Sequence, residues 1–189
     1  MVQIYPFSII AAALLAATSA LAQDKPTLLP ERDVDITYRV TAASEKPVKQ
    51  RVRWLAAKHL QRIDGPGAAV SLADRMTAYI TILSSRTKTY VKLEESSDKP
   101  FKVDPAASFT RDSKDTVANL PCTEWSWVDA STQSPRTLCA TDDGVMLRMT
   151  ENGHVLFEAT AVTYRHANPR TFEVPSDYQP TLVPDTSSD

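Results

Sequence analysis

The sequence predicts a mainly β protein, built as a curved antiparallel sheet (an open half-barrel) with few short helices. Apolar and polar residues alternate with period two through most of the chain, as in the segment 33–40 (DVDITYRV). Turn-forming residues interrupt this alternation at short intervals, and no apolar pattern of helical period extends over three turns. A length of 189 residues fits one domain. We therefore expect about ten short strands in a half-barrel, a closed barrel or a sandwich.

The first 22 residues differ in composition from the rest of the chain. The apolar run 9–17 is too short for a stable membrane span, and Ala20 and Ala22 place small residues where a signal peptidase accepts them. All charged residues follow Ala22. We predict a cleaved signal peptide and a mature chain that begins near Gln23. The alternative, a buried N-terminal helix, is disfavoured by the prolines that follow at 26 and 30. No cysteine follows the cleavage site, so we expect a soluble exported protein without a lipid anchor.

The chain divides into a signal peptide (1–22), an extended lead-in (23–32), a single β domain (33–180) and a disordered polar tail (181–189). Within the domain, alternation or short apolar runs predict strands at 34–40, 48–56, 68–73, 79–83, 87–93, 122–128, 136–141, 145–149 and 155–164. Residues 60–64 are expected to continue the second strand, and 109–110 and 116–120 to lead into 122–128. The clearest turns are Gly65-Pro66-Gly67 and Asn152-Gly153, the latter because both of its residues accept a positive φ.

The two cysteines are predicted to form a disulfide. Cys122 and Cys139 are equidistant from Ala130-Ser131, which lies within the turn-rich segment 129–135. In a hairpin with that centre they lie directly opposite each other on adjacent antiparallel strands. A bridge there would contribute about 3 kcal/mol in the chain-entropy model, and disulfides persist in oxidising compartments. The alternative is a catalytic dithiol, but the sequence has no Cys-x-x-Cys motif.

Composition excludes most enzyme classes that have a recognisable motif. Four glycines are too few for a Gly-rich phosphate loop, and His59, His154 and His166 stand in no metal-ligand spacing. Glu124 beside Trp125 is a conceivable general acid, and a hydrolase would need a histidine within reach of a serine and a carboxylate. We expect no enzyme activity, no cofactor and no metal. The net charge of -2 gives no basic footprint for nucleic acid.

A basic cluster marks the second predicted strand and the residues after it. Its members are Lys49, Arg51, Arg53, Lys58 and Arg62. Our interpretation is a solvated outer strand face, with contact to anionic headgroups of a membrane surface as the alternative.

The apolar faces of the strands carry the functional hypothesis. In an open, curved sheet they would line a concave groove able to hold acyl chains, whereas in a closed sandwich they would form the core. The predicted ligand-binding residues are Trp54, Ile80, Ile82, Trp125, Leu147, Met149 and Phe157.

Four motifs in a fixed order resemble a known family. They are DVDITY (33–38), Ile82-Leu83 before Lys88-Thr89-Tyr90, VANLxCTEW (117–125) and FxVPxxY (172–178). Together they resemble an uncharacterised family of exported bacterial proteins related to the outer-membrane lipoprotein carrier LolA and its receptor LolB. Where that family more often has glycine before Cys122, this chain has Asn119, which can also adopt a left-handed conformation.

The resemblance implies an open, curved sheet whose apolar concave side is covered by short helices. It also implies a location in the periplasm of a Gram-negative cell and a lipid or an acylated protein as the ligand. The sequence itself lacks the amphipathic lid helices of the true carriers. The alternative is an envelope interaction protein with a closed β core that docks a protein partner through a sheet edge or its basic face.

Overall fold

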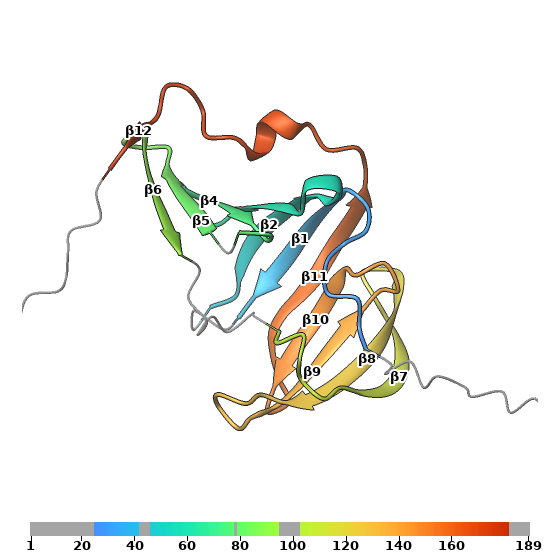
Figure 1. Cartoon of the computed structure of the whole chain (residues 1–189). Helices are drawn as coiled ribbons and strands as arrows, with labels where there is room; N and C mark the ends of the chain where they lie inside the picture. Colours follow the sequence, from blue (N-terminus) through green and yellow to red (C-terminus); the bar gives the residue numbers. More distant parts are fainter. Residues whose placement is uncertain (1–24, 42–45, 78, 95–102, 182–189) are drawn as a thin grey trace, which may run out of the picture.

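The computed structural model describes residues 25–41, 46–77, 79–94 and 103–181 (Figure 1). The described strands form one large sheet that does not close, so the predicted mainly β fold with an open, curved sheet is confirmed. The predicted signal peptide and nearly all of the predicted tail lie outside the described residues. Within the part of the chain that is described, no helix has the length and apolar character that crossing a membrane requires.

The described residues form twelve strands and two short 3-10 helices. In chain order they are β1 (Val34–Val40), β2 (Val48–Leu55), the 3-10 helix η1 (Ala56–Lys58), β3 (Leu60–Asp64), β4 (Ala69–Asp74), β5 (Tyr79–Ser84), β6 (Thr89–Glu94), β7 (Thr110–Val117), β8 (Leu120–Val128), β9 (Pro135–Ala140), β10 (Met146–Glu151), β11 (His154–Tyr164), the 3-10 helix η2 (Pro169–Phe172) and β12 (Gln179–Pro180).

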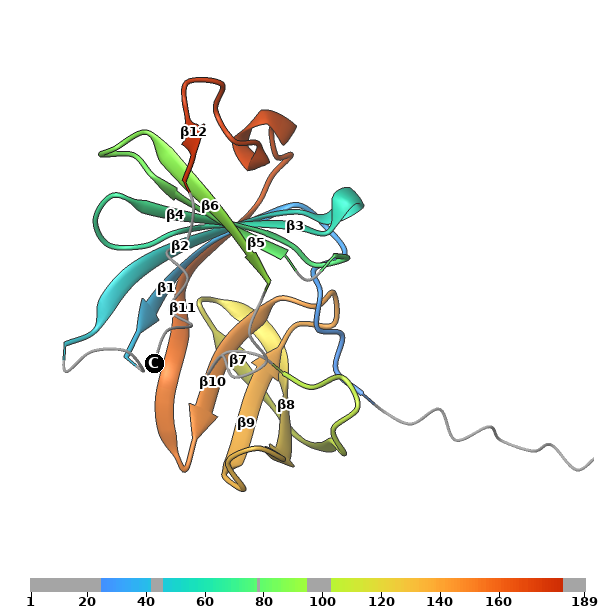
Figure 2. The same ribbon diagram turned by 60° about the vertical axis from the view of Figure 1, so that its left-hand side comes forward.

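The first strand lies in the middle of the sheet. The order is β12-β6-β5-β4-β3-β2-β1-β11-β10-β9-β8-β7, so β1 pairs with β2 on one side and with β11 on the other. Strands β1–β6 form an open arm, and β7–β11 form a more tightly rolled half beside it (Figures 1 and 2). In the rolled half, β7 returns to contact β11 although the two strands are not hydrogen-bonded neighbours.

Alternation along β1 determines where the core lies. Val34, Ile36 and Val40 are buried, whereas Arg39 points to solvent. Tyr38 belongs to the buried set, where its hydroxyl donates a hydrogen bond to the Met146 carbonyl at 2.7 Å. Burial raises the pKa of this phenol well above its usual value. The buried face of β1 therefore joins the arm to the rolled half through one continuous core.

The C-terminal segment covers the opposite face of the arm. Helix η2 contacts β3, and Arg62 on β3 donates a hydrogen bond to the Thr171 carbonyl at 3.0 Å. Phe172 is buried there, close to Leu60 and Leu72. The resemblance implied short helices over the concave side, and this expectation is wrong for the described residues, since η2 packs on the other side of the sheet.

Three sequence expectations about individual strands are corrected. Residues 60–64 do not continue β2 but turn back as β3, because η1 and a left-handed His59 (φ 51°) reverse the chain. Strand β7 extends over 110–117, and it was not predicted because Arg111–Lys114 are exposed and show no apolar pattern. The cysteines are diagonal neighbours, because Cys139 pairs with Glu124 and the hairpin is centred one residue later than expected. The Cys122–Cys139 disulfide itself is confirmed, with the α-carbons 5.5 Å apart.

Candidate functional site

A mainly apolar cavity of about 150 Å³ lies on the face of the arm that carries Ile36, Trp54 and Ile80, called here the groove face. Side chains from β1 to β5 and from β10 and β11 line it together with the segment before β1. The lining residues are Leu28, Leu29, Pro30, Ile36, Tyr38, Val40, Gln50, Val52, Trp54, Gln61, Ile63, Ala73, Arg75, Ile80, Gly144, Met146 and Phe157. We call this cavity the groove pocket.

The strand register explains why these residues converge. Directly paired residues on neighbouring strands lie on the same face of a sheet. Ile36 pairs with Val52, and the pairings of Val52 with Ile63 and of Ala73 with Ile80 continue the same face toward β5. On the other side, Val40 pairs with Phe157. One face of six strands is therefore mainly apolar around the pocket.

The apolar surface continues beyond the groove pocket to the edge of the sheet. Ile82 pairs with Val91, and Ile80 pairs with Leu93, so all four lie on the groove face. Ile82, Val91 and Leu93 are only half-buried in the described structure. An elongated apolar ligand that entered the pocket would therefore find further apolar surface along β5 and β6.

The segment 25–32, called here the N-terminal strap, forms one wall of the pocket through Leu28, Leu29 and Pro30. The Glu31 amide donates a hydrogen bond to the Asp143 carbonyl at 2.9 Å. Arg32 forms an ion pair with the Asp143 carboxylate at 2.7 Å and lies over the Tyr164 ring, 3.9 Å from its centroid. These polar contacts attach the strap to the rolled half.

Polar groups of the pocket come from three strands or their ends. Gln50 and Gln61 contribute side-chain amides, and Arg75, which follows β4, contributes a guanidinium group. All three are partly exposed. The site therefore combines an apolar interior with a few hydrogen-bond donors, which is the usual composition of a small-ligand site.

The predicted site residues separate into two groups. Trp54, Ile80 and Phe157 line the groove pocket, and Ile82 lies on its apolar extension. Leu147 and Met149 have no exposed surface and lie in the core of the rolled half. Trp125 is also buried, with Arg111 stacked over its ring at 5.5 Å, and does not line the pocket. As a statement about ligand binding, the complete set stays a prediction.

The strap and Met146 were not predicted from the sequence as parts of the site. The apolar pair Leu28-Leu29 within the polar lead-in was a visible signal, but its docking place depends on contacts made after folding. Met146 reaches the groove face because the β9–β10 register shifts between Met146 and Arg148.

An acidic cluster elsewhere in the rolled half is an ion-pair network. Asp115 and Glu124 approach the sulfur of Cys139 closely enough to resemble a metal site. However, Arg148 lies between the two carboxylates, 2.5 Å from Asp115 and 2.7 Å from Glu124, and Cys139 is in the disulfide. These contacts occupy Glu124, the residue considered as a general acid. The contact between Arg148 on β10 and Asp115 on β7 also requires the sheet to roll, since these strands are three positions apart in the sheet.

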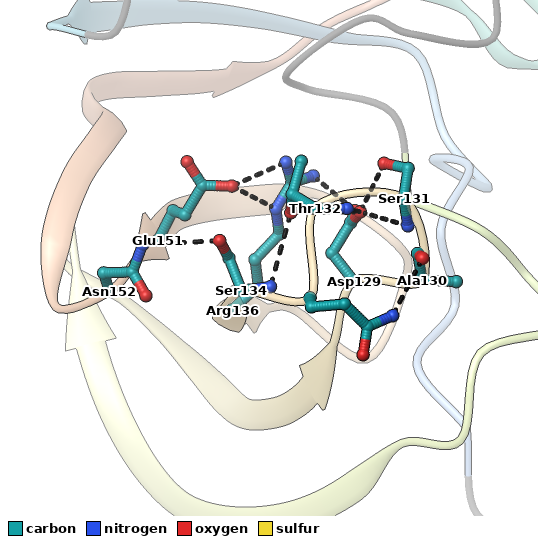
Figure 3. Close-up of polar contacts among 9 residues, drawn as sticks. Asp129, Ala130, Ser131, Thr132, Ser134, Arg136, Glu151 and Asn152 are labelled. Atoms are coloured by element: carbon teal, nitrogen blue, oxygen red, sulfur yellow. Dashed lines mark hydrogen bonds and ion pairs between the residues drawn. The ribbon is translucent and has the colours of Figure 1, made fainter.

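A second polar network closes the end of the β8–β9 hairpin (Figure 3). Arg136 is 5% exposed and lies between Glu151, at 2.7 Å, and Asp129, at 3.0 Å. The Asp129 carboxylate also accepts hydrogen bonds from the Ser131 hydroxyl and from the amides of Ser131 and Thr132. The Ser131 hydroxyl, the two amides and Arg136 lower the Asp129 pKa to about 2, against the effect of burial. The network orders the turn, and none of its residues lines the groove pocket.

Comparison with known proteins gives structural but no sequence matches. No protein-family model matches the chain, and no curated protein matches it either. An uncharacterised conserved protein from Thermus thermophilus superposes with a TM-score of 0.58 at 13% identity, over 80% of this chain and 90% of that chain.

Structures of MucB are also similar. The Pseudomonas aeruginosa MucA/MucB complex gives a TM-score of 0.54, and MucB in complex with MucA(peri) gives 0.52, both at 13% identity. Each covers 82% of this chain but only 59% and 58% of the matched chain, so this chain spans less than two thirds of MucB. At this identity the similarities show the fold alone. They support a LolA-like fold, as the sequence resemblance implied.

Proposed function

We propose that the protein is a non-enzymatic binding protein of the periplasm that holds an apolar chain, the acyl chain of a lipid or of an acylated protein, on the groove face. The observation that supports this best is the groove pocket with its half-buried extension over Ile82, Val91 and Leu93. Burial of apolar surface would supply the binding energy, at about 25 cal/mol per Å². The disulfide is consistent with an oxidising compartment.

The size of the pocket restricts how such a ligand could lie. An apolar cavity of about 150 Å³ accepts a group of roughly the size of benzene, whereas sites for larger ligands occupy about 300–1,000 Å³. The groove pocket has a volume of about 150 Å³. We therefore propose that it takes the end of one acyl chain, while the rest of the chain lies along β5 and β6.

A second candidate function is the docking of a protein partner on the same face. It is favoured by the fold similarity to MucB, which has been crystallised with MucA. A bulky apolar side chain of a partner would fit the pocket as well as a chain end does. The two candidates differ in the chemical nature of the ligand and not in its place.

Filling the pocket tests the first candidate. Ala73 is buried and lines the pocket, so Ala73→Leu adds volume inside it. Ala69→Leu is the matched control, because Ala69 is exposed on the same strand and does not line the pocket. The mature oxidised protein is titrated with a fluorescent fatty acid. We expect saturable binding by the wild type and the control, and none by Ala73→Leu. Equal binding by both variants would place the ligand elsewhere.

Cross-linking in cells distinguishes the two candidates. A photoreactive amino acid replaces Val91 on the groove face or, as the control, Lys92 on the opposite face of the same strand. Mass spectrometry then identifies what is attached. A lipid adduct at position 91 alone supports acyl-chain binding, and a defined polypeptide at position 91 alone supports a protein partner. The same adducts at both positions would contradict a ligand on the groove face.

A further inference from the structure

A second cavity, of about 240 Å³, is lined by Asp35 and Arg53, which lie on the face of β1 and β2 opposite the groove face. Its walls come from β1, β2 and the segment 165–172. Two guanidinium groups, of Arg53 and Arg165, and the imidazole of His166 line it, against the single carboxylate of Asp35. Arg53 belongs to the basic cluster singled out in the sequence, and the acyl-binding proposal gives that cluster no role.

Arg53 has a polar atom that lacks a partner. Its Nη2 forms an ion pair with Asp64, but its Nε is fully buried and makes no hydrogen bond within the described structure. A buried N–H group without a partner is costly, so such groups are usually satisfied by water or by a ligand. Arg53 as a whole remains 21% exposed, so a small ligand can approach its side chain.

The carboxylate in this cavity is already neutralised. Asp35 binds Arg51 at 2.5 Å and also forms an ion pair with Arg165. Hydrogen bonds from Arg51 and Arg165 hold the pKa of Asp35 below its usual value, although partial burial opposes the shift. Asp35 is therefore charged but shared between two arginines. The residues that line the cavity include two arginines and one carboxylate, and this balance favours an anion.

The wall formed by the C-terminal segment is held in place by hydrogen bonds. Both carboxylate oxygens of Asp33 accept hydrogen bonds from backbone amides, one from Ala56 at 2.8 Å and one from Ala167 at 2.9 Å. His166 stands at the rim, 3.6 Å from Asp33 and 96% exposed. Arg53 on β2 and Arg165 and His166 after β11 therefore approach the cavity from two sides.

We propose that this cavity binds a phosphate group through Arg53 and Arg165. Guanidinium groups form paired, charge-assisted hydrogen bonds to phosphate oxygens. A tetrahedral oxyanion can receive donors from two sides at once, here from the exposed part of the Arg53 guanidinium group and from Arg165. The site is independent of the groove pocket. Its phosphate could belong to a free phosphorylated compound or to a lipid headgroup.

The test is a titration of the mature oxidised protein with inorganic phosphate at constant ionic strength, followed by NMR of the arginine Nε–H groups. We expect the Arg53 Nε–H resonance to move in a saturable way. Arg53→Lys keeps a positive charge beside Asp64 but has no Nε–H, and Arg165→Gln removes the second donor. Each should weaken binding by about tenfold or more, because one charge-assisted hydrogen bond is lost.

Arg39→Gln is the matched control. Arg39 and Arg165 are both 54% exposed and each forms an ion pair with one acid, but Arg39 does not line the cavity. Binding that is unchanged in Arg39→Gln and weakened in the other two variants supports the site. No saturable shift in the wild type, or the same loss in all three variants, would overturn it. Thermal unfolding of each variant shows whether it is folded.

Co-sedimentation with vesicles identifies the source of the phosphate. Vesicles containing phosphatidylglycerol are compared with vesicles of phosphatidylcholine alone. Binding to the anionic vesicles that is lost in Arg53→Lys and kept in Arg39→Gln supports a headgroup. Phosphate binding without vesicle binding supports a free phosphorylated compound.

Discussion

Gly144 faces the carbonyl group of Leu29 so closely that a β-carbon at position 144 would stand 2.7 Å from the Leu29 carbonyl carbon. Gly144 also has a φ of 88°. This contact joins the turn before β10 to the N-terminal strap, and both line the groove pocket. The absence of a side chain at residue 144 therefore allows the strap to form a wall of the pocket.

Replacing Gly144 by alanine should release the strap. We expect faster hydrogen exchange at the Glu31 amide, which is bonded to Asp143, and easier proteolysis before Val34. The control is Gly67→Ala, since Gly67 has the same φ of 88° but nothing within 4 Å of the added β-carbon. Both variants carry the backbone cost of about 1–2 kcal/mol. If exchange at Glu31 is the same in both, the contact with Leu29 does not hold the strap.

Replacing Ala118 by glycine should stabilise the protein. Ala118 and Asn119 form the two-residue turn between β7 and β8, both with positive φ, at 50° and 63°. Alanine is strained there by about 1–2 kcal/mol, and part of the gain is offset because glycine orders at a greater entropic cost. We expect a net increase of about 0.5–1 kcal/mol in the free energy of unfolding, measured by urea denaturation.

Asn119→Gly is the comparison for that turn. Asparagine tolerates a left-handed conformation better than alanine does, so this variant should change stability less than Ala118→Gly. A larger gain at Asn119 than at Ala118 would contradict the assignment of strain.

Reducing the disulfide should lower stability by about 3 kcal/mol, because the bridge closes a loop between residues 17 apart in sequence. The measurement is urea denaturation with and without a reductant. The double variant Cys122→Ala, Cys139→Ala should be insensitive to reductant and close to the reduced wild type. A reductant effect that persists in the double variant would come from something other than the bridge.

The Asp129 network should contribute to acid denaturation. The folded-state pKa of about 2 is lower than the ordinary value of 3.8, so the ionised form is favoured by folding. Its stabilising contribution is complete above pH 3.8 and is lost as the pH falls toward 2. Asp129→Asn should therefore lower stability at neutral pH and reduce the loss between pH 4 and pH 2. Urea denaturation at several pH values measures both, and an unchanged slope in the variant would contradict the prediction.

Alternation in the sequence was sufficient to predict most of the arm. It placed Trp54, Ile80 and Ile82 on one face, because in a regular strand every second side chain points the same way. The same reasoning could not separate Phe157 from Met149, which are cross-strand neighbours. Phe157 lines the pocket and Met149 is enclosed in the core, and this difference depends on how far the sheet rolls.

The positions of the β-bulges could not be predicted either, because they too depend on how the strands pair. Register shifts occur in β10 next to Leu147 and in β11 next to Leu156, and each reassigns the faces that follow. The ion pairs between Arg51 and Asp35 and between Arg53 and Asp64 could also not be predicted without the strand order. The sequence pattern of the basic cluster therefore indicated a solvated cationic face, whereas in the structure Arg51, Arg53 and Arg62 form ion pairs with carboxylates.

The central place of β1 has a consequence for how the chain reaches this structure. Strands β1–β6 and β7–β11 can each assemble from hairpins between sequence neighbours, which form early and locally. Strand pairing joins the two meanders where Val34 to Val40 pair with Tyr164 to Phe157. That closure comes late, because it requires a loop of more than a hundred residues to be brought together. A chain shortened before β11 would keep β1 as an unpaired edge and be prone to aggregation.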